Sequence, residues 1–347
     1  MKVLKYITYQ TIIIAVMTLY SCSNDEYQTT GTDKPVAIRF SGVSVNDNTV
    51  SVTRATGADA HNEGLPIGSD IDVFIYDSSG NAVYEYDEDA DTSPSVTLPM
   101  VYTTIDEPDA ETAKSNLNIK DSSLKPPRYP NGNPGTAYIF AVWPAMALSS
   151  EASADSYTFS VAADQRDASA VASSDLLATD QIQQLSTGGK AIDLPMTHCM
   201  AKVIVRFNPT GNLTASNMPA TFDMLGIKNS VTIRPKTAAI AGSGNGRDAI
   251  TTNSGTTTIQ CTAGQAFLIP PQTIAQSTKL LEFNIGGTAS DNFSAISGAS
   301  FTTTNAITFV ANMVYEITIN VNVNYITATA TITPWNTEDM TFDKYIL

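Results

Sequence analysis

The chain has few cysteines and few charged residues for its length. Three cysteines among 347 residues are too few for a fold built on disulfides. Only 15% of the residues are charged, against about a quarter in most globular proteins. Basic residues are the scarcer kind, since 19 Lys and Arg face 34 Asp and Glu, which gives a net charge of −15. A surface this acidic repels phosphate backbones, so we expect no nucleic-acid partner.

Signatures of catalysis are missing as well. The two histidines, His61 and His198, lie far apart, and no His-Glu-x-x-His, Gly-x-Ser-x-Gly or Cys-x-x-Cys motif occurs. Residues 244–249 formally fit the Gly-x-Gly-x-x-Ala form of a dinucleotide loop. The Thr- and Ser-rich residues that follow do not predict the helix that such a loop needs. We therefore expect no enzyme and no cofactor.

Two features leave a binding role open. Alternating aspartates in residues 87–91 are spaced like the first ligands of a calcium loop, but the Gly and Glu of an EF-hand are missing. A solvated acidic loop is the favoured interpretation, with weak calcium binding as the alternative. Trp143 and Trp335 could stack on sugars, yet each ends an apolar run, which favours packing in the core or at its edge.

The N-terminus has the pattern of a secretion signal. Lys2 and Lys5 precede Ile7–Leu19, a mostly apolar run that is too short for a stable membrane-spanning helix. Leu19-Tyr20-Ser21-Cys22 follows and resembles the lipobox of bacterial lipoproteins, in which the signal peptide is cut off before an acylated cysteine.

This resemblance implies a signal peptide over residues 1–21 and lipidation of Cys22, followed by a flexible tether over residues 22–33. Attached acyl chains would then hold the protein in the outer membrane as a lipoprotein. A buried cysteine behind an ordinary signal peptide, or a short N-terminal helix, is the alternative.

The remaining sequence is dominated by the two-residue alternation of β-strands. It is clearest in Tyr315–Val323, where five apolar residues fall on one face, and it recurs in Ile71–Tyr76, Lys202–Phe207 and Glu282–Ile285. Turn residues such as those of Asp77–Asn81 separate the runs. Strands at this spacing with little helix predict an all-β protein made of β-sandwiches.

The length favours two domains, because single cores seldom grow past about 250 residues. We place the boundary between residues 195 and 196, which gives an N-terminal domain of 34–195 and a C-terminal domain of 196–347. The one fair helix pattern is Ser173–Leu185, and residues 87–135 carry few strand patterns. Cys199 and Cys261 could pair or stay free, and both alternatives remain open.

Several segments form an ordered set along the mature chain. They are Val36–Gly42, Val52–Ala55, Ile71–Tyr76, Leu194–Val203 around His198, Tyr315–Ile319 and Ile332–Asn336. In this order they resemble the fimbrillin-like (Mfa-like, FimA-like) lipoproteins of Bacteroides and Porphyromonas, the subunits of type V pili. The resemblance implies two tandem transthyretin-like Greek-key β-sandwich domains with few short helices.

The resemblance also implies assembly by donor-strand exchange. In that family an arginine-specific protease removes an N-terminal segment with its first strand, and a neighbouring subunit fills the groove. Here Arg54 would be the cleavage site, with Ala55 as the new first residue and residues 34–54 as the removable segment. Val36, Ile38 and Phe40 would be the apolar residues of the removable strand. The candidate donor strand carries apolar residues on one face, namely Ile326, Ala328, Ala330 and Ile332, a pattern that also suits an ordinary edge strand.

The sequence therefore predicts a structural or adhesive subunit of a cell-surface fimbria. Expected partners are other pilus subunits in a homo- or heteropolymer, the arginine-specific protease, the outer membrane, and a host or bacterial surface ligand. A non-enzymatic, glycan-binding surface lipoprotein is the alternative function. The Arg54 segment separates the two, because a glycan-binding module has no need of it.

Overall fold

The structure is a computed structural model of the chain. It describes residues 38–45, 65–77, 99–107, 114–122, 127, 137–148, 156–179, 183–185, 191–236, 249–287, 294–335 and 345–346. The expectations for the signal peptide, the tether, Cys22, Val36, Arg54, Ala55 and the acidic residues 87–91 lie outside these ranges.

The regular secondary structure of the described residues is almost entirely β-strand, as the alternation predicts, and forms an all-β sandwich fold. Up to residue 198 the strands are β1 (Phe40–Val45), β2 (Asp70–Asp77), β3 (Met100–Thr104), β4 (Lys114–Ser115), β5 (Leu117–Ile119), β6 (Ala137–Trp143), β7 (Tyr157–Ser160), β8 (Leu177–Thr179), β9 (Gln183–Leu185) and β10 (Ile192–His198). From residue 201 on, the strands are β11 (Ala201–Pro209), β12 (Thr221–Lys228), β13 (Ser230–Ile233), β14 (Ile250–Thr252), β15 (Thr256–Thr262), β16 (Ala266–Ile269), β17 (Gln272–Ile274), β18 (Lys279–Ile285), β19 (Ile296–Thr302), β20 (Ile307–Phe309), β21 (Met313–Val321), β22 (Ile326–Pro334) and β23 (Tyr345–Ile346). Helix α3 (Ala168–Ala172) and the 3-10 turn η2 (Ala215–Asn217) complete the set.

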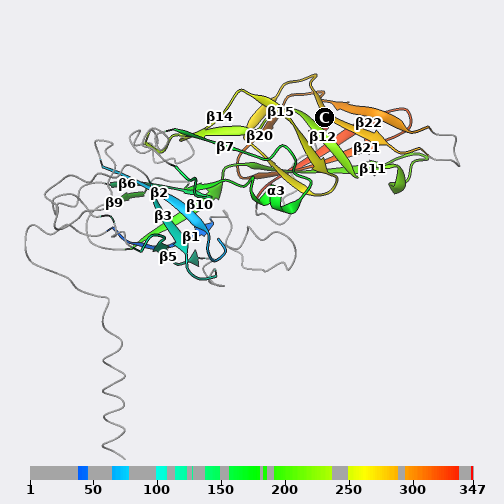
Figure 1. Cartoon of the computed structure of the whole chain (residues 1–347). Coiled ribbons are helices and arrows are strands. Elements are labelled where there is room, and N and C mark those ends of the chain that lie inside the picture. Colours follow the sequence, from blue (N-terminus) through cyan, green and yellow to red (C-terminus); the bar gives the residue numbers. More distant parts are fainter. Residues whose placement is uncertain are drawn as a thin grey trace, which may run out of the picture.

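The strands gather in two parts (Figure 1). The first part is a single sheet in the order β4-β1-β10-β8-β6-β2-β3-β5, and β9 adds to β6. β1 and β10 run parallel, whereas the other pairs of this sheet are antiparallel. The sheet coils far enough that β1, near one end, meets β3, near the other: the rings of Phe40 and Tyr102 lie 5.0 Å apart.

The second part packs a sheet of order β16-β11-β21-β22-β23 with one of order β15-β12-β18-β19. β11 and β21 are parallel neighbours, and β21 and β22 form a hairpin of nine paired positions. Its shorter sheets are β14-β13-β7 and β17-β20. The alternation predicted for Tyr315–Val323 is confirmed as far as Val321 by β21, in which Tyr315, Ile317, Ile319 and Val321 are buried. Val323 lies beyond the end of β21 and is 39% exposed, so its predicted place on that face is wrong.

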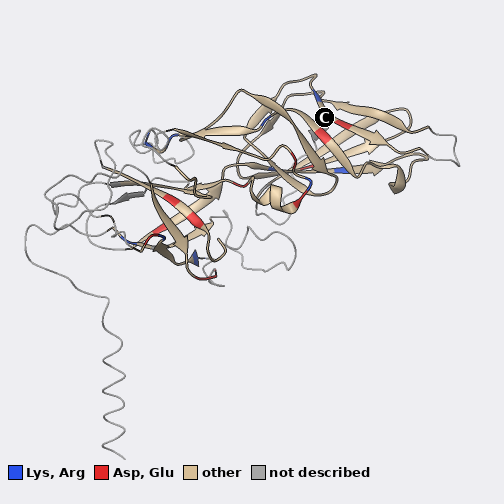
Figure 2. Ribbon diagram, in the orientation of Figure 1, with Lys and Arg blue, Asp and Glu red and all other residues tan. Residues whose placement is uncertain are grey.

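Two apolar cores lie on opposite faces of the first sheet. One core contains Ile71, Val73 and Ile75 of β2 together with residues of β1 and β10. The other contains Phe74 and Tyr76 of the same strand and continues through the second part. β2 is therefore buried on both faces, and its acidic residues are drawn red in Figure 2.

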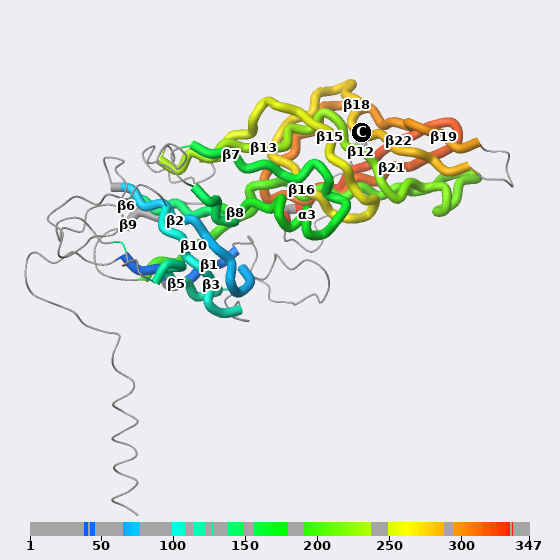
Figure 3. Tube along the Cα trace, viewed as in Figure 1, coloured from blue at the N-terminus to red at the C-terminus, as the bar shows by residue number. Residues whose placement is uncertain are grey.

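The domain boundary between residues 195 and 196 stays a prediction, although two contacts bear on it. These residues lie in the middle of β10, which belongs wholly to the first sheet. β7, in contrast, precedes the boundary but pairs with β13 in the second part (Figure 3).

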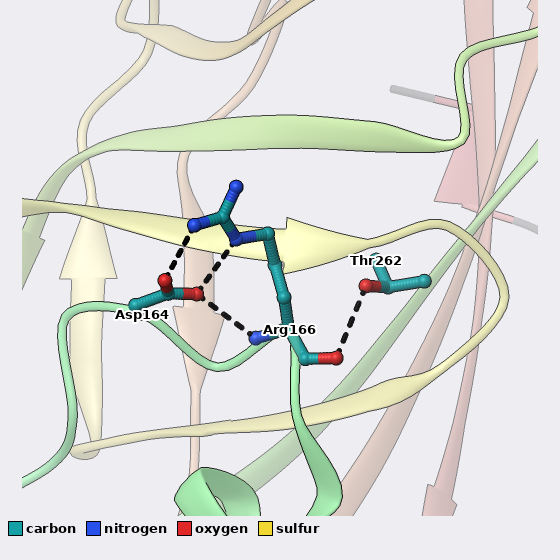
Figure 4. A network of polar contacts seen from close by, with 3 residues as sticks. All are labelled: Asp164, Arg166 and Thr262. Atoms are coloured by element: carbon teal, nitrogen blue, oxygen red, sulfur yellow. Dashed lines mark hydrogen bonds and ion pairs between the residues drawn. The ribbon is translucent and has the colours of Figure 1, made fainter.

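The segment after β7 is also tied to the second part. The buried side chain of Gln165 donates to the Leu268 carbonyl oxygen over 2.8 Å and accepts from the Leu268 amide over 2.8 Å. Beside it, Asp164 accepts from the Arg166 Nε over 2.8 Å, and the Arg166 carbonyl oxygen accepts from Thr262 over 3.4 Å (Figure 4). The Arg166 guanidinium lowers the pKa of Asp164 from 3.8 to about 2, mainly by hydrogen bonding.

The helix predicted over Ser173–Leu185 is wrong. α3 ends where that pattern begins, and Ser174 closes it by donating to the Ala170 carbonyl oxygen over 2.7 Å. Leu176 and Leu177 then point into different cores. A strand buried on both faces reads as a continuous apolar run, which periodicity cannot distinguish from a buried helix.

Cys199 and Cys261 are buried thiols that form no disulfide with each other, and burial raises the pKa of Cys261. After the Gly-rich residues 244–249 the chain forms β14, so the helix of a dinucleotide site does not follow.

Within the described residues, no group of His, Cys, Asp or Glu could hold a metal ion. In the same part of the chain, no helix is long and apolar enough to cross a membrane.

Candidate strand-exchange site

The candidate site is the place of β1, between β10 and β4. β1 pairs in parallel with β10 from Phe40, opposite Ile192, to Val45, opposite Met196. On its other side it pairs antiparallel with β4. The Arg39 carbonyl oxygen accepts from the Ile192 amide over 2.9 Å. β1 is therefore an inner strand of the sheet, and we call the space that it fills the slot.

The inward face of β1 belongs to the first core. Ile38 is 2% exposed, Val43 is fully buried and Val45 is 7% exposed. They lie in one cluster with Leu194 and Met196 of β10. Burial of apolar side chains is the main stabilising contribution of such a strand, at about 25 cal/mol per Å².

The residues predicted for the removable strand differ in how deeply they are buried. Ile38 is buried, Phe40 is half-buried against Tyr102, and Val36 lies outside the described residues. Among the described residues, the strand is Phe40–Val45, which begins at the last of the residues predicted for it. Its pairing with β10 shifts between Phe40 and Gly42, so the apolar face changes from even to odd residue numbers. The prediction missed Val43 and Val45 as apolar residues of this strand, although their alternation with Ser44 is a strand signal in the sequence.

Gly42 fits against the backbone of β4. A Cβ atom there would lie 2.9 Å from the carbonyl oxygen of Ser115, which is closer than real Cβ atoms approach. Ser115 is fully buried and donates from its hydroxyl to the Leu65 carbonyl oxygen over 2.7 Å. The slot therefore has no room for a Cβ atom at Gly42.

An ion pair joins the two strands that border the slot. Lys114 Nζ on β4 lies 2.5 Å from Asp193 Oδ2 on β10. Gly42 is aligned with Asp193 and Ser44 with Lys114, so the pair crosses the outer face of β1. With side chains 40% and 47% exposed, it contributes about 1 kcal/mol or less to stability.

This arrangement can bind an extended chain. Without β1, β10 and β4 would present unpaired backbone groups beside an apolar trough lined by Leu194 and Met196. A strand that enters there forms main-chain hydrogen bonds and buries alternate side chains, which is β-augmentation.

The predicted donor residues lie in β22, near the border of the second part's sheet. Ala328 is 1% exposed, while Ile326, Ala330 and Ile332 are partly buried against the same core. In the described part of the chain, β22 has β21 on one side and only the two-residue β23 on the other.

A buried aromatic stack holds the end of β22. The Trp335 ring lies parallel to that of His198, with centroids 3.9 Å apart, and His198 Nδ1 is 3.0 Å from Asp175 Oδ1. Lys202 Nζ lies 5.4 Å from the Trp335 ring centroid. Trp335 is 7% exposed and Trp143 is half-buried, which confirms the packing interpretation of both.

Comparison with known proteins gives a family and a fold. A family model described as fimbrillin-like matches residues 53–335. Two candidate cell adhesion proteins of known structure are similar, both 14% identical with a TM-score of 0.54. The protein from Bacteroides uniformis covers 88% of this chain and 100% of its own, and the one from Bacteroides ovatus 89% and 100%. At this identity they show the fold alone. No curated protein sequence matches the chain.

Proposed function

This chain belongs to the fimbrillin-like family, and from that premise we propose that it is a pilus subunit that assembles by donor-strand exchange. Membership of this family makes it a structural or adhesive protein of the cell-surface fimbrium.

The proposed route begins with a lipoprotein precursor anchored through Cys22 in the outer membrane. An arginine-specific protease then cuts between Arg54 and Ala55 and releases residues 34–54, which include β1. Arg54 stands among Ser, Thr and Gly residues, where an extended chain fits a protease. Arg39, although exposed, directly precedes β1, and its carbonyl oxygen is already bonded to the Ile192 amide of β10.

One observation carries the proposal: β1 is the segment nearest the N-terminus in the described chain, yet it is an inner strand of its sheet. Its loss would leave β10 and β4 without the strand between them and the first core without Ile38, Val43 and Val45. A neighbouring subunit would supply the replacement. We propose β22, with Ile326, Ala328, Ala330 and Ile332, as the strand that this subunit donates to its own neighbour in turn.

The test compares cells that produce the natural chain with cells that produce Arg54→Gln. Filaments are sheared from the cells, and the first residue of the chain is determined in the filament and membrane fractions. We expect natural filaments to contain a chain starting at Ala55. The Arg54→Gln chain should remain in the membrane fraction with an acylated Cys22, whereas an Arg39→Gln control should assemble normally.

Two results would contradict the proposal. One is an Arg54→Gln chain that enters filaments as efficiently as the natural chain. The other is a natural chain that is absent from filaments and is retained on polysaccharide affinity gels, which would favour the glycan-binding alternative.

A further inference from the structure

The slot has no room for a side chain at one position. A Cβ on Gly42 would lie 2.9 Å from the Ser115 carbonyl oxygen and 3.6 Å from the Ser115 carbonyl carbon. Both are backbone atoms, so a change of rotamer cannot relieve the contact. Any strand in the register of β1 meets the same restriction.

β4 cannot easily move away to make room. Ser115 is held through its buried hydroxyl by the Leu65 carbonyl oxygen. The next residue, Asn116, donates from its backbone to Asp106 Oδ1 over 2.7 Å and from its side chain to Asp106 Oδ2 over 2.6 Å. Its carbonyl oxygen accepts from the Ile105 amide over 3.0 Å. A shift of β4 would break these bonds together, and loss of the buried bond from Ser115 would leave a buried polar group without its partner.

The candidate donor strand of this chain, β22, does not satisfy the requirement for glycine at this position. β22 has the sequence Ile-Thr-Ala-Thr-Ala-Thr-Ile-Thr-Pro, without glycine, so in either direction it would place a side chain against Ser115. Among the described strands, β19 repeats the Ser-Gly-apolar-Ser-apolar order of β1. Its Ala299 and Phe301, however, are buried in the core of the second part.

We infer that the slot selects a strand with glycine directly before an apolar-x-apolar pair, as in Gly42-Val43-Ser44-Val45. Because β22 lacks this glycine and β19 is buried in its own core, the slot receives the strand from a subunit of different sequence rather than from a described strand of a second copy. This inference rests on the proposed function and names its partner. The pilus would be a heteropolymer at this joint, with Gly42 marking the position that distinguishes acceptable donors from others.

The test offers labelled peptides to the full chain, in which residues 53–56 are replaced by the recognition sequence of a site-specific protease. After cleavage, the released β1 segment stays as competitor, and peptide uptake is followed by fluorescence anisotropy. The peptides are residues 38–45, the same peptide with Gly42→Val or with Ser44→Val, residues 326–334, and residues 326–334 with Thr329→Gly. The last creates the order Gly-apolar-x-apolar within the β22 sequence.

We expect uptake of residues 38–45 and of the Ser44→Val peptide, whose changed side chain lies on the half-buried outer face. The Gly42→Val peptide should bind at least about fivefold more weakly, since the added side chain overpacks the slot. Residues 326–334 should not compete unless Thr329→Gly is present.

Equal uptake of the natural and Gly42→Val peptides, or uptake of unmodified residues 326–334 as strong as that of 38–45, would overturn the inference and leave strand exchange intact. If the cleaved chain took up no peptide, not even residues 38–45, the proposed function itself would fail and the inference with it.

Discussion

The indole ring of Trp335 lies flat on the imidazole of His198, with 7° between the ring planes. Trp335 directly follows β22, the proposed donor strand, and His198 is the last residue of β10, which borders the slot. The strand beside the acceptor slot and the end of the proposed donor strand are thus in direct contact within one molecule. Trp335 also donates from its amide to the Asn312 carbonyl oxygen over 3.1 Å, which fixes the end of the hairpin.

We predict that Trp335→Ala destabilises the chain by about 3–5 kcal/mol, because it removes a large buried ring. It also leaves the buried pair of His198 and Asp175 without its cover. Urea unfolding followed by circular dichroism measures the loss, and hydrogen exchange should quicken in β22 more than in β18. Trp335→Phe, which keeps a ring against His198, is the matched control. An unchanged unfolding midpoint in Trp335→Ala would contradict the anchoring role.

The Lys114–Asp193 pair should affect the release of β1 more visibly than overall stability. Lys114→Ala or Asp193→Ala should change the free energy of unfolding by about 1 kcal/mol or less, because both side chains are partly exposed. After cleavage, the labelled β1 segment should leave up to about fivefold faster, and 1 M salt should act on the natural chain in the same direction. Lys279→Ala, which removes another exposed ion pair, should not change the rate. A release rate unaffected by either substitution would exclude the role.

Asp72 should make stability depend on pH. Its side chain is fully buried, its Oδ2 accepts from the Met146 amide over 2.7 Å, and none of the described residues forms a hydrogen bond with Oδ1. Burial, with a smaller contribution from Asp70, raises the pKa of Asp72 from 3.8 to about 7.

Between these two pKa values the folded chain holds a proton that the unfolded chain has lost. Stability therefore falls as pH rises from about 4 to 7, by up to about 1.4 kcal/mol per pH unit, and this contribution is constant above and below that range. Asp72→Asn should remove the dependence and be more stable than the natural chain at pH 8. Unfolding midpoints at pH 4.5 and 8 test this, with Glu282→Gln at an exposed acid as control. A natural chain as stable at pH 8 as at pH 4.5, relative to Asp72→Asn, would contradict the prediction.

The sequence predicted those strands whose apolar residues alternate in one phase. Ile71–Tyr76, Lys202–Phe207 and Glu282–Ile285 all lie within observed strands, namely β2, β11 and β18. The prediction failed where the apolar alternation changes phase within a segment, or where a strand is buried on both faces. The irregular pairing between Phe40 and Gly42 moved the first strand beyond its predicted end.

The candidate site was less predictable than the fold, because its geometry depends on contacts between distant residues. β4 has two residues, too few to show any period, and lies in a stretch with few strand patterns. Lys114 and Asp193 are 79 positions apart, so no local pattern could indicate their ion pair. Nothing near Gly42 in sequence reveals the Ser115 carbonyl oxygen that requires it.

The most direct test of the central claim locks β1 in its slot. Ser44 and Lys114 are paired neighbours on the two strands, within reach of a disulfide after Ser44→Cys and Lys114→Cys. The chain carrying the cleavable sequence at residues 53–56 is oxidised, cut and offered the labelled peptide of residues 38–45. We predict no uptake until a reductant opens the disulfide, whereas Ser44→Cys alone should take up peptide throughout. Equal uptake by the oxidised and the reduced chain would contradict the claim that β1 must leave before another strand can enter.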